Sequence, residues 1–280
     1  MREVHVDQII QKISQMCIDC NYNIGKDIED ALSRAETSEI SPIGKSIVSD
    51  LLLNSKIAKD MQMPICQDTG MVVVFVEIGQ EVHISGGVLE EAIQQGIREG
   101  YEKGYLRKSV VNDPLLRINS KDNTPGVVYY ELVAGDHLKI SLAAKGFGSE
   151  NMSKLKMLKP SDGMEGVEDF VINTVMEAGP NPCPPIVVGV GIGGTVDKAA
   201  QIAKKALFRN VDESSPLPHI SELEKRLLEK INQLGIGPQG LGGLNTALGV
   251  NVEIYPTHIA GLPVVVNINC HASRHAVAYL

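Results

Sequence analysis

Three cysteines that lie far apart in the sequence carry the strongest chemical signal in this chain. They are Cys66 in PICQDTG, Cys183 in NPCPP and Cys270 in NINCHASRH. Each stands among Gly, Pro, Asn, Asp or Ser, which favour tight turns over helix or strand interiors. Structural zinc usually takes closely spaced cysteine pairs, whereas three separated loop thiolates suit an iron–sulfur cluster. A four-iron cluster on three thiolates keeps one iron open as a Lewis acid, which predicts hydro-lyase chemistry.

Free cysteines also pack as small hydrophobic residues, so three buried structural cysteines are the alternative interpretation. The turn-rich surroundings favour ligation over that alternative. The two other cysteines, Cys17 and Cys20, form a C-x-x-C on the apolar stripe of a helix predicted over 6–20. We interpret them as core or interface residues; a redox or metal-binding pair is the alternative, without a second cysteine pair nearby. An odd total of five cysteines argues against a disulfide framework.

Composition narrows the class of protein. The chain has 280 residues, 43% of them hydrophobic, which suffices for the core of one large or two small domains. Its formal charge is −8, and aromatic residues make up only 4% with no tryptophan, which disfavours nucleic-acid partners. No apolar run reaches the roughly 20 residues of a membrane helix, and the first residues lack a secretory apolar segment. We therefore expect a soluble, cytoplasmic protein without membrane contact.

The hydrophobic periodicity predicts helices and strands along the whole chain. A helix begins at Ser41-Pro42, a good cap and first-turn pair, and continues to about Met61. Its predicted buried face consists of Ile43, Ile47, Leu51, Leu52 and Ile57. Further helices are predicted over 86–103, 162–178, 196–208 and 220–234. Strands are predicted over 71–78, 126–133, 137–144, 186–190, 250–255 and 263–268, and the second and third of these are predicted to form a hairpin through Ala134-Gly135-Asp136.

These elements alternate but also pair locally, so the sequence predicts a mixed α/β (α+β) fold with mixed sheets flanked by helices. A single domain over 1–280 is expected, with a possible lobe boundary near 209–219. The run Gly189–Gly194 spells G-x-G-x-x-G, with Asp212 about 20 residues further on, as in dinucleotide-binding folds. However, no apolar strand precedes Asp212, so a Rossmann fold is not expected. The glycines are predicted to bring backbone near the cluster or a helix N-terminus near an anion.

Six segments in order resemble the class I, iron–sulfur fumarate hydratase family, in particular the α component of its two-subunit type. They are CQDTG, KGFGSENMSKLKML, NPCPP with VGVGIGGT, GPQGLGG, YPTHIAGLPV and NINCHASRH. The resemblance implies that loops with Cys66, Cys183 and Cys270 converge on one cleft and bind a 4Fe–4S cluster. It implies reversible hydration of fumarate to malate, with the related L-tartrate dehydratase as the alternative. A non-catalytic iron–sulfur or zinc-binding module is the alternative from another class.

The resemblance also assigns roles to residues that are ambiguous by themselves. Asp68 in DTG is otherwise a turn residue, and His258 is otherwise a structural histidine; the resemblance makes them a hydrogen-bonded catalytic pair. Gln67 and Arg107 match positions that bind substrate carboxylates, although Arg107 alone could be a solvated surface charge. Gly148 would offer its backbone N–H to the dicarboxylate substrate.

The sequence also predicts a missing component. The chain ends shortly after Cys270, whereas single-chain relatives continue into a second domain with the catalytic base and cationic substrate contacts. Few cations lie near the motifs of this acidic chain. We therefore expect activity only with a separate β subunit, in an α₂β₂ assembly, since closed symmetry is the common solution for oligomers.

Overall fold

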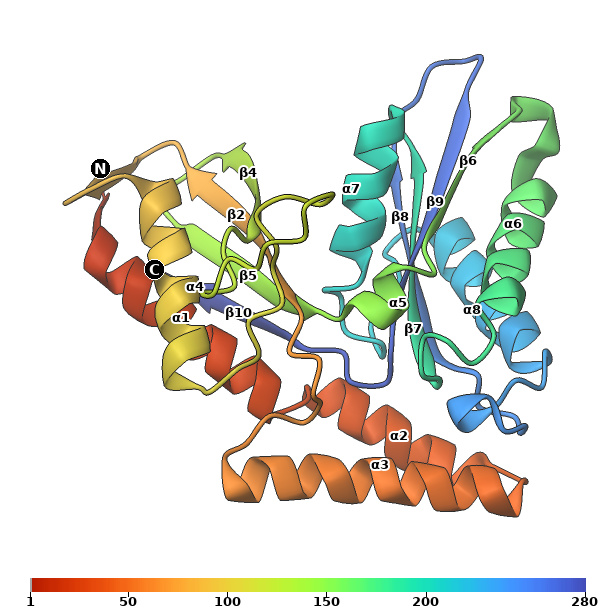
Figure 1. Ribbon diagram of the computed structural model, residues 1–280. Coiled ribbons are helices and arrows are strands. Elements are labelled where there is room, and N and C mark those ends of the chain that lie inside the picture. The colour runs from red at the N-terminus through yellow and green to blue at the C-terminus, as the bar shows by residue number, and fades with distance from the viewer. Residues whose placement is uncertain (1) are drawn as a thin grey trace. The chain divides into compact units, whose positions relative to one another are not determined.

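The computed structural model describes residues 2–280, which divide into two compact units. The first unit comprises Met1–Gly25, Ser55–Phe147 and Arg274–Leu280, and the second comprises Lys26–Asn54 and Gly148–Ser273. Each unit contains a mixed sheet flanked by helices, which confirms the predicted fold class (Figure 1). The segment 209–219 lies inside the second unit, between two of its helices.

The sheet of the first unit has two inner strands, β5 and β2, that are mostly buried. Its order is β10–β5–β2–β4, with β4 parallel to β2 and with β5 antiparallel to both β2 and β10. Strands β1 and β3 form a separate, two-stranded parallel sheet. The strands are β1 (Arg2–His5), β2 (Met71–Gly79), β3 (Val82–Ser85), β4 (Val127–Val133), β5 (Leu138–Lys145) and β10 (His275–Tyr279).

The predicted hairpin of 126–133 with 137–144 is wrong. Both strands exist as β4 and β5, but β2 lies between them and pairs with each. The apolar run of β2 is buried on both faces, so β2 takes the central place with a neighbour on each side. The connection passes over the end of β2, where Glu81 N donates to Gly135 O (3.0 Å) and Gly79 N donates to His137 O (2.9 Å).

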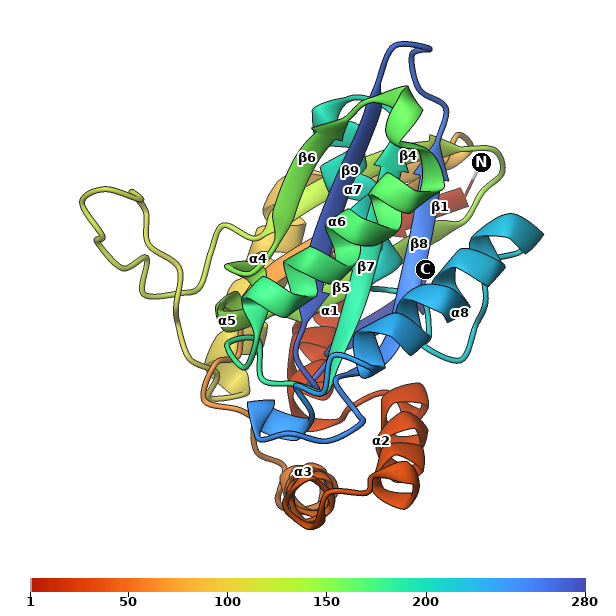
Figure 2. The same ribbon diagram turned by 90° about the vertical axis from the view of Figure 1, so that its right-hand side faces the viewer.

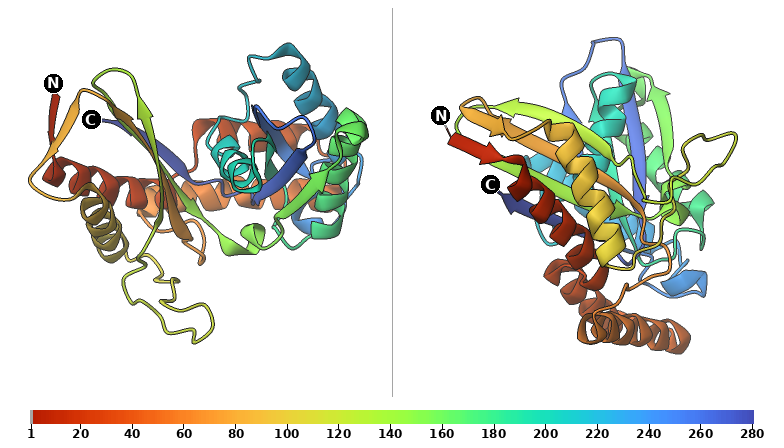
Figure 3. Two further views of the ribbon diagram at one scale, coloured as in Figure 1. Left: turned by 90° about the horizontal axis from the view of Figure 1, so that it is seen from above. Right: turned by 60° about the vertical axis from the view of Figure 1, so that its left-hand side comes forward.

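Helices α1 (Val6–Tyr22) and α4 (Leu89–Lys103) lie side by side and pack against this sheet (Figure 3). Two glycines of α4 allow the close approach. A methyl group on Gly96 would lie 2.8 Å from the carbonyl oxygen of Ile10, and one on Gly100 would lie 2.7 Å from that of Ser14. Any larger residue at either glycine would therefore push the two helices apart.

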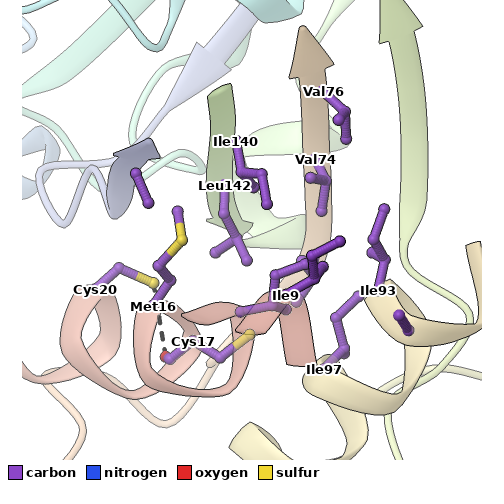
Figure 4. Close-up of a cluster of buried hydrophobic side chains, with 14 of the residues drawn as sticks. Ile9, Met16, Cys17, Cys20, Val74, Val76, Ile93, Ile97, Ile140 and Leu142 are labelled. Atoms are coloured by element: carbon purple, nitrogen blue, oxygen red, sulfur yellow. Dashed lines mark hydrogen bonds between the residues drawn. The ribbon is translucent and has the colours of Figure 1, made fainter. Parts of the chain in front are cut away.

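The cysteine pair of α1 belongs to the core formed by these helices. Cys17 and Cys20 are buried among aliphatic side chains, as Figure 4 shows, which confirms their interpretation as core residues. Burial raises the pKa of the Cys17 thiol well above its ordinary value and raises that of Cys20 to about 12. Both thiols are thus protonated and shielded from solvent at neutral pH, unlike a metal-binding or redox pair.

The second unit has a four-stranded sheet in the order β6–β9–β7–β8, with β7 antiparallel to β9 and parallel to β8. Two helices cover one face of this sheet and a third covers the other (Figure 2). The strands are β6 (Lys154–Leu158), β7 (Ile186–Gly193), β8 (Ala247–Tyr255) and β9 (Leu262–Asn269). The helices are α6 (Gly163–Ala178) and α8 (Pro218–Asn232) on one face, and α7 (Val196–Ala206) on the other.

The glycines of the G-x-G-x-x-G run allow helix packing. A methyl group on Gly189 would lie 2.4 Å from the carbonyl oxygen of Ala203, and one on Gly191 would lie 2.1 Å from that of Ala199. These glycines of β7 therefore let α7 lie directly on the strand; their predicted role near a cluster or an anion stays a prediction. Between α7 and α8 the described chain has no strand, as expected for a fold that is not of the Rossmann type.

Helix α3 (Pro42–Met61) begins as predicted, with Gly44 N donating to Ser41 Oγ (3.2 Å). Its predicted buried face is wrong, because Ile43 is 60% exposed and Ile57 is 42% exposed. Only a few positions of this helix are buried, and the apolar residues predicted for its buried face are partly or fully exposed. The preceding helix, α2 (Lys26–Ser38), was not predicted. The fully buried positions of α3 are Gly44, Val48 and Ala58.

A buried carboxylate anchors the connection between α2 and α3 to the glycine-rich loop of the second unit. Glu39 is only 5% exposed, and its carboxylate accepts bonds from Ser41 N (3.0 Å), Leu244 N (3.1 Å) and Asn245 N (3.1 Å). Burial by itself raises the pKa of a carboxyl group, but these bonds and one from the Asn245 amide lower the pKa of Glu39 to about 2.

The substitution Glu39→Gln should destabilise the second unit at neutral pH. Since the folded pKa is lowered from 4.5 to about 2, the carboxylate contributes stability above pH 4.5 that is lost as pH falls toward 2. The shift corresponds to about 3 kcal/mol in the free energy of unfolding. Denaturant titrations from pH 7 to pH 2 should therefore show a smaller pH dependence for the variant. Glu29→Gln, an exposed change on α2, is the matched control; equal profiles for Glu39→Gln and wild type would contradict the assignment.

Candidate active site and the cysteine loops

In the first unit, the candidate residues of CQDTG lie in the loop between α3 and β2. Cys66 is half-buried, with its Sγ 3.4 Å from Oε1 of Gln67. The carboxylate of Asp68 accepts Gly70 N on Oδ1 and Phe147 N on Oδ2, both at 2.9 Å. Asp68 therefore caps its own turn, and two backbone N–H groups fix its orientation.

Backbone carbonyl groups of this loop accept hydrogen bonds from buried polar side chains. The Tyr101 hydroxyl donates to Thr69 O (2.6 Å), and Asn123 Nδ2 donates to Gly70 O (3.1 Å). The guanidinium of Arg274 donates to Asp68 O. Three consecutive carbonyl groups thus have side-chain donors, which gives the loop one conformation.

Arg107 belongs to a neighbouring loop of the same unit. Thr69 Oγ1 donates to the Arg107 carbonyl (3.2 Å), and Asn123 Oδ1 accepts Ser109 N (2.7 Å) while its amide nitrogen holds Gly70. The Arg107 side chain is exposed. The structure therefore brings the backbones that carry Cys66, Gln67, Asp68 and Arg107 together in the first unit.

In the second unit, sheet pairing places Cys183 and Cys270 at the same end of the sheet. Cys183 precedes β7 and Cys270 follows β9, and these antiparallel strands pair with Val187 opposite Asn269. The backbone N–H of His271 donates to Cys183 O (3.4 Å), and His271 Nδ1 lies 3.1 Å from the same oxygen. Nδ1 donates to this carbonyl when it carries the proton, and in the other tautomer it can accept from the Gln239 amide nitrogen.

Gln239, in the glycine-rich loop, joins the two cysteine loops. Its backbone N and its Nε2 donate to Pro184 O at 2.7 and 2.8 Å, and Nε2 lies 3.4 Å from His271 Nδ1. Both Gln239 (φ +51°) and Cys183 (φ +55°) have left-handed backbone conformations. Such conformations cost non-glycine residues about 1 kcal/mol or more, so the surrounding contacts impose them.

Gly148 lies in the short helix α5 (Phe147–Glu150), where it is exposed. The helix end is anchored by Glu150, whose carboxylate binds Lys204 Nζ (2.5 Å) and Asn267 Nδ2 (2.8 Å). Asn267 also donates to Ser153 Oγ (2.7 Å). These contacts fix the turn after Gly148 within the second unit.

His258 is placed differently from the cysteines of its unit. It is exposed in the loop between β8 and β9, and its Nδ1 accepts Ala260 N (3.2 Å). Because β8 runs parallel to β7, this loop follows the opposite end of the sheet from Cys183 and Cys270. There His258 lines a mainly apolar pocket of about 490 Å³. The second unit does not bring His258 to its two cysteines.

The donor set formed by the three loop cysteines fits thiolate ligation of an iron–sulfur cluster. None of the five cysteines forms a disulfide; Cys183 is exposed, and Cys66 and Cys270 are partly exposed in polar loops. Such thiols are accessible to a soft metal centre, whereas those of Cys17 and Cys20 are buried in the core. Within residues 2–280, no group of three or more His, Cys, Asp or Glu side chains is already assembled as a metal site.

Comparison with known proteins identifies the class. Residues 10–279 match the family described as "Fumarate hydratase (Fumerase)", and the chain belongs to this family of hydro-lyases. The names of two relatives are more specific than that of the family. The "Putative L(+)-tartrate dehydratase subunit alpha" of Methanocaldococcus jannaschii is 47% identical over 90% of each chain. The "L(+)-tartrate dehydratase subunit alpha" of Escherichia coli strain K12 is 33% identical over 98% of this chain and 92% of its own length.

The helices described for residues 2–280 include none with both the length and the apolar character needed to cross a membrane.

Several residues of the candidate site were not found from the sequence. Asn123 and Tyr101 have no local motif, because each acts through contacts with a distant loop. Gln239 stands in GPQGLGG and Arg274 in NINCHASRH, so only the motif around each was visible.

Proposed function

We propose that this chain is the α subunit of an iron–sulfur hydro-lyase for a small dicarboxylate, and that Cys66, Cys183 and Cys270 bind its 4Fe–4S cluster. The observation that carries the proposal is the contrast between the two kinds of cysteine. The three loop thiols are accessible and lie on backbones held by many hydrogen bonds, whereas the helix pair is buried in apolar core. Family membership supports the same assignment.

Bound there, the cluster would supply a Lewis acid that polarises a substrate oxygen. The chain's own residues would bind and orient the substrate. The exposed Arg107 guanidinium offers a carboxylate two parallel charge-assisted bonds, and Gln67 and the Gly148 N–H offer neutral ones. A local cation is needed, because the chain carries a formal charge of −8 and would otherwise repel a dicarboxylate.

Asp68 is the proposed proton-transfer group of the first unit. Its two backbone donors orient the carboxylate, and each oxygen retains lone-pair capacity for a proton or a substrate hydroxyl. Pairing of Asp68 with His258 rests on the family resemblance, since the two residues belong to different units. The cytoplasmic location expected from the sequence also stays a prediction.

For the substrate we propose the fumarate–malate pair. L-tartrate is the second candidate, and it is favoured by the names of the relatives from Methanocaldococcus jannaschii and Escherichia coli. These names also support a separate β subunit, since each designates a subunit alpha. An α₂β₂ assembly is the proposed holoenzyme.

The test is turnover by the reconstituted complex. The chain is co-expressed with the β subunit of the same source, its cluster is rebuilt anaerobically, and kcat/KM is measured for malate, fumarate and L-tartrate. We expect at least tenfold preference for malate and fumarate, and negligible activity for the isolated chain. Preference for L-tartrate would select the second candidate. A complex with a full complement of iron and sulfide that converts none of the three would contradict the hydro-lyase proposal, and zinc without sulfide would indicate a structural module.

A further inference from the structure

Arg274 is a buried cation of the first unit with an unusual set of partners. Arg274 is only 3% exposed. One terminal nitrogen donates to Asn21 Oδ1 (3.1 Å) and to the carbonyl oxygen of Asp68, and its Nε has no hydrogen-bond partner within residues 2–280. Its guanidinium thus points at the backbone of the CQDTG loop.

Other arginines that are at least partly buried have carboxylate partners. Arg209 pairs with Glu224, and Arg98 pairs with Asp122 at 2.9 Å. In the described part of the chain Arg274 makes no such ion pair. Burying a guanidinium without a carboxylate costs several kcal/mol in desolvation, so stability by itself does not explain this placement.

Asn21 is in turn fixed by the end of α1. Its side-chain Nδ2 donates to Cys17 O (2.9 Å). Its backbone carbonyl oxygen accepts the N–H of Ile65 (2.9 Å), the residue directly before Cys66. Asn21 therefore contacts the loop at one end and orients Arg274 toward Asp68 within the same loop. The small side chain of Cys20 lies near enough for the Arg274 charge to act on its thiol.

We propose that Arg274 is a positioning residue, which with Asn21 fixes the backbone of Cys66–Gly70 in the conformation that presents the Cys66 thiol and the Asp68 carboxylate. Arg274 also follows Cys270 by four positions in the sequence. Arg274 is the first residue of the C-terminal segment that belongs to the first unit. The catalytic consequence rests on the proposed function, whereas the anchoring itself does not.

Hydrogen–deuterium exchange on the chain without cluster tests the anchoring. Arg274→Met should speed amide exchange in residues 66–70 at least tenfold, because Asp68 O loses its donor. Arg274→Lys should give an intermediate effect, since an ammonium group cannot reproduce the planar fork. Arg209→Met is the matched control: it removes a partly buried arginine from the second unit, and should lower the melting temperature without changing exchange in 66–70.

In the reconstituted protein, Arg274→Met should also shorten the lifetime of the cluster under a chelator at least tenfold relative to Arg209→Met. Wild-type protection of residues 66–70 in Arg274→Met would overturn the proposal. Should that variant fail to fold, Arg274→Lys and Asn21→Ala carry the test, and unchanged exchange in both would overturn it. If Arg274→Met speeds exchange in 66–70 but the wild-type holoenzyme is inactive, only the proposed function is refuted. If the wild-type holoenzyme is active but Arg274→Met leaves exchange unchanged, only the positioning role is refuted.

Discussion

Replacing Cys66, Cys183 or Cys270 with serine is expected to abolish cluster assembly on this chain. A serine hydroxyl is a hard donor that stays protonated at neutral pH, so it cannot replace a thiolate toward iron. Each variant should retain its fold, because these cysteines lie in loops and are at least partly exposed. Iron and sulfide analysis, together with the visible absorption of anaerobically reconstituted protein, measures the loss.

The helix cysteines provide the matched controls. Cys17→Ala and Cys20→Ala, or the corresponding serines, should lower stability because they alter a packed core. They should still retain iron and sulfide at the wild-type level. Loss of the cluster in a Cys17 or Cys20 variant, with retention in Cys183→Ser, would reverse the assignment.

Asp68→Asn in the complex with the β subunit should reduce turnover by about 10²-fold or more, the usual scale for a positioned proton-transfer group. The structure adds a second reason. Both carboxylate oxygens accept a backbone N–H, so the amide nitrogen of asparagine would face the donor of Gly70 or Phe147. Steady-state kinetics on samples matched for iron content separate the catalytic loss from any loss of cluster.

Asp113→Asn controls for local capping. Asp113 lies in the same unit and its Oδ1 accepts Leu115 N and Leu116 N, a bond pattern that asparagine can keep with its own oxygen. Turnover of this variant should stay near wild type. A rate for Asp68→Asn within a factor of three of wild type would remove Asp68 from the proton transfer.

The sequence by itself determined most of the local structure and the chemistry of the candidate site. Periodicity located α1, α3 and α4 and three strands of each sheet, because burial on one face repeats at a fixed interval; β6 and β10 were not predicted. Turn residues around Cys66, Cys183 and Cys270 predicted their loops, and the apolar stripe predicted the burial of Cys17 and Cys20. These are properties of short segments, so a single chain suffices to read them.

Only the tertiary structure decided which segments meet. The central place of β2 between β4 and β5 depends on its burial on both faces, which adjacency in the sequence does not reveal. Sheet direction placed His258 and Cys270 at opposite ends of the second unit, although β9 alone separates them. The anchoring by Asn123, Gln239 and Arg274 joins residues distant in the sequence. Such contacts follow from the path of the whole chain, and a local pattern of residue types carries no information about them.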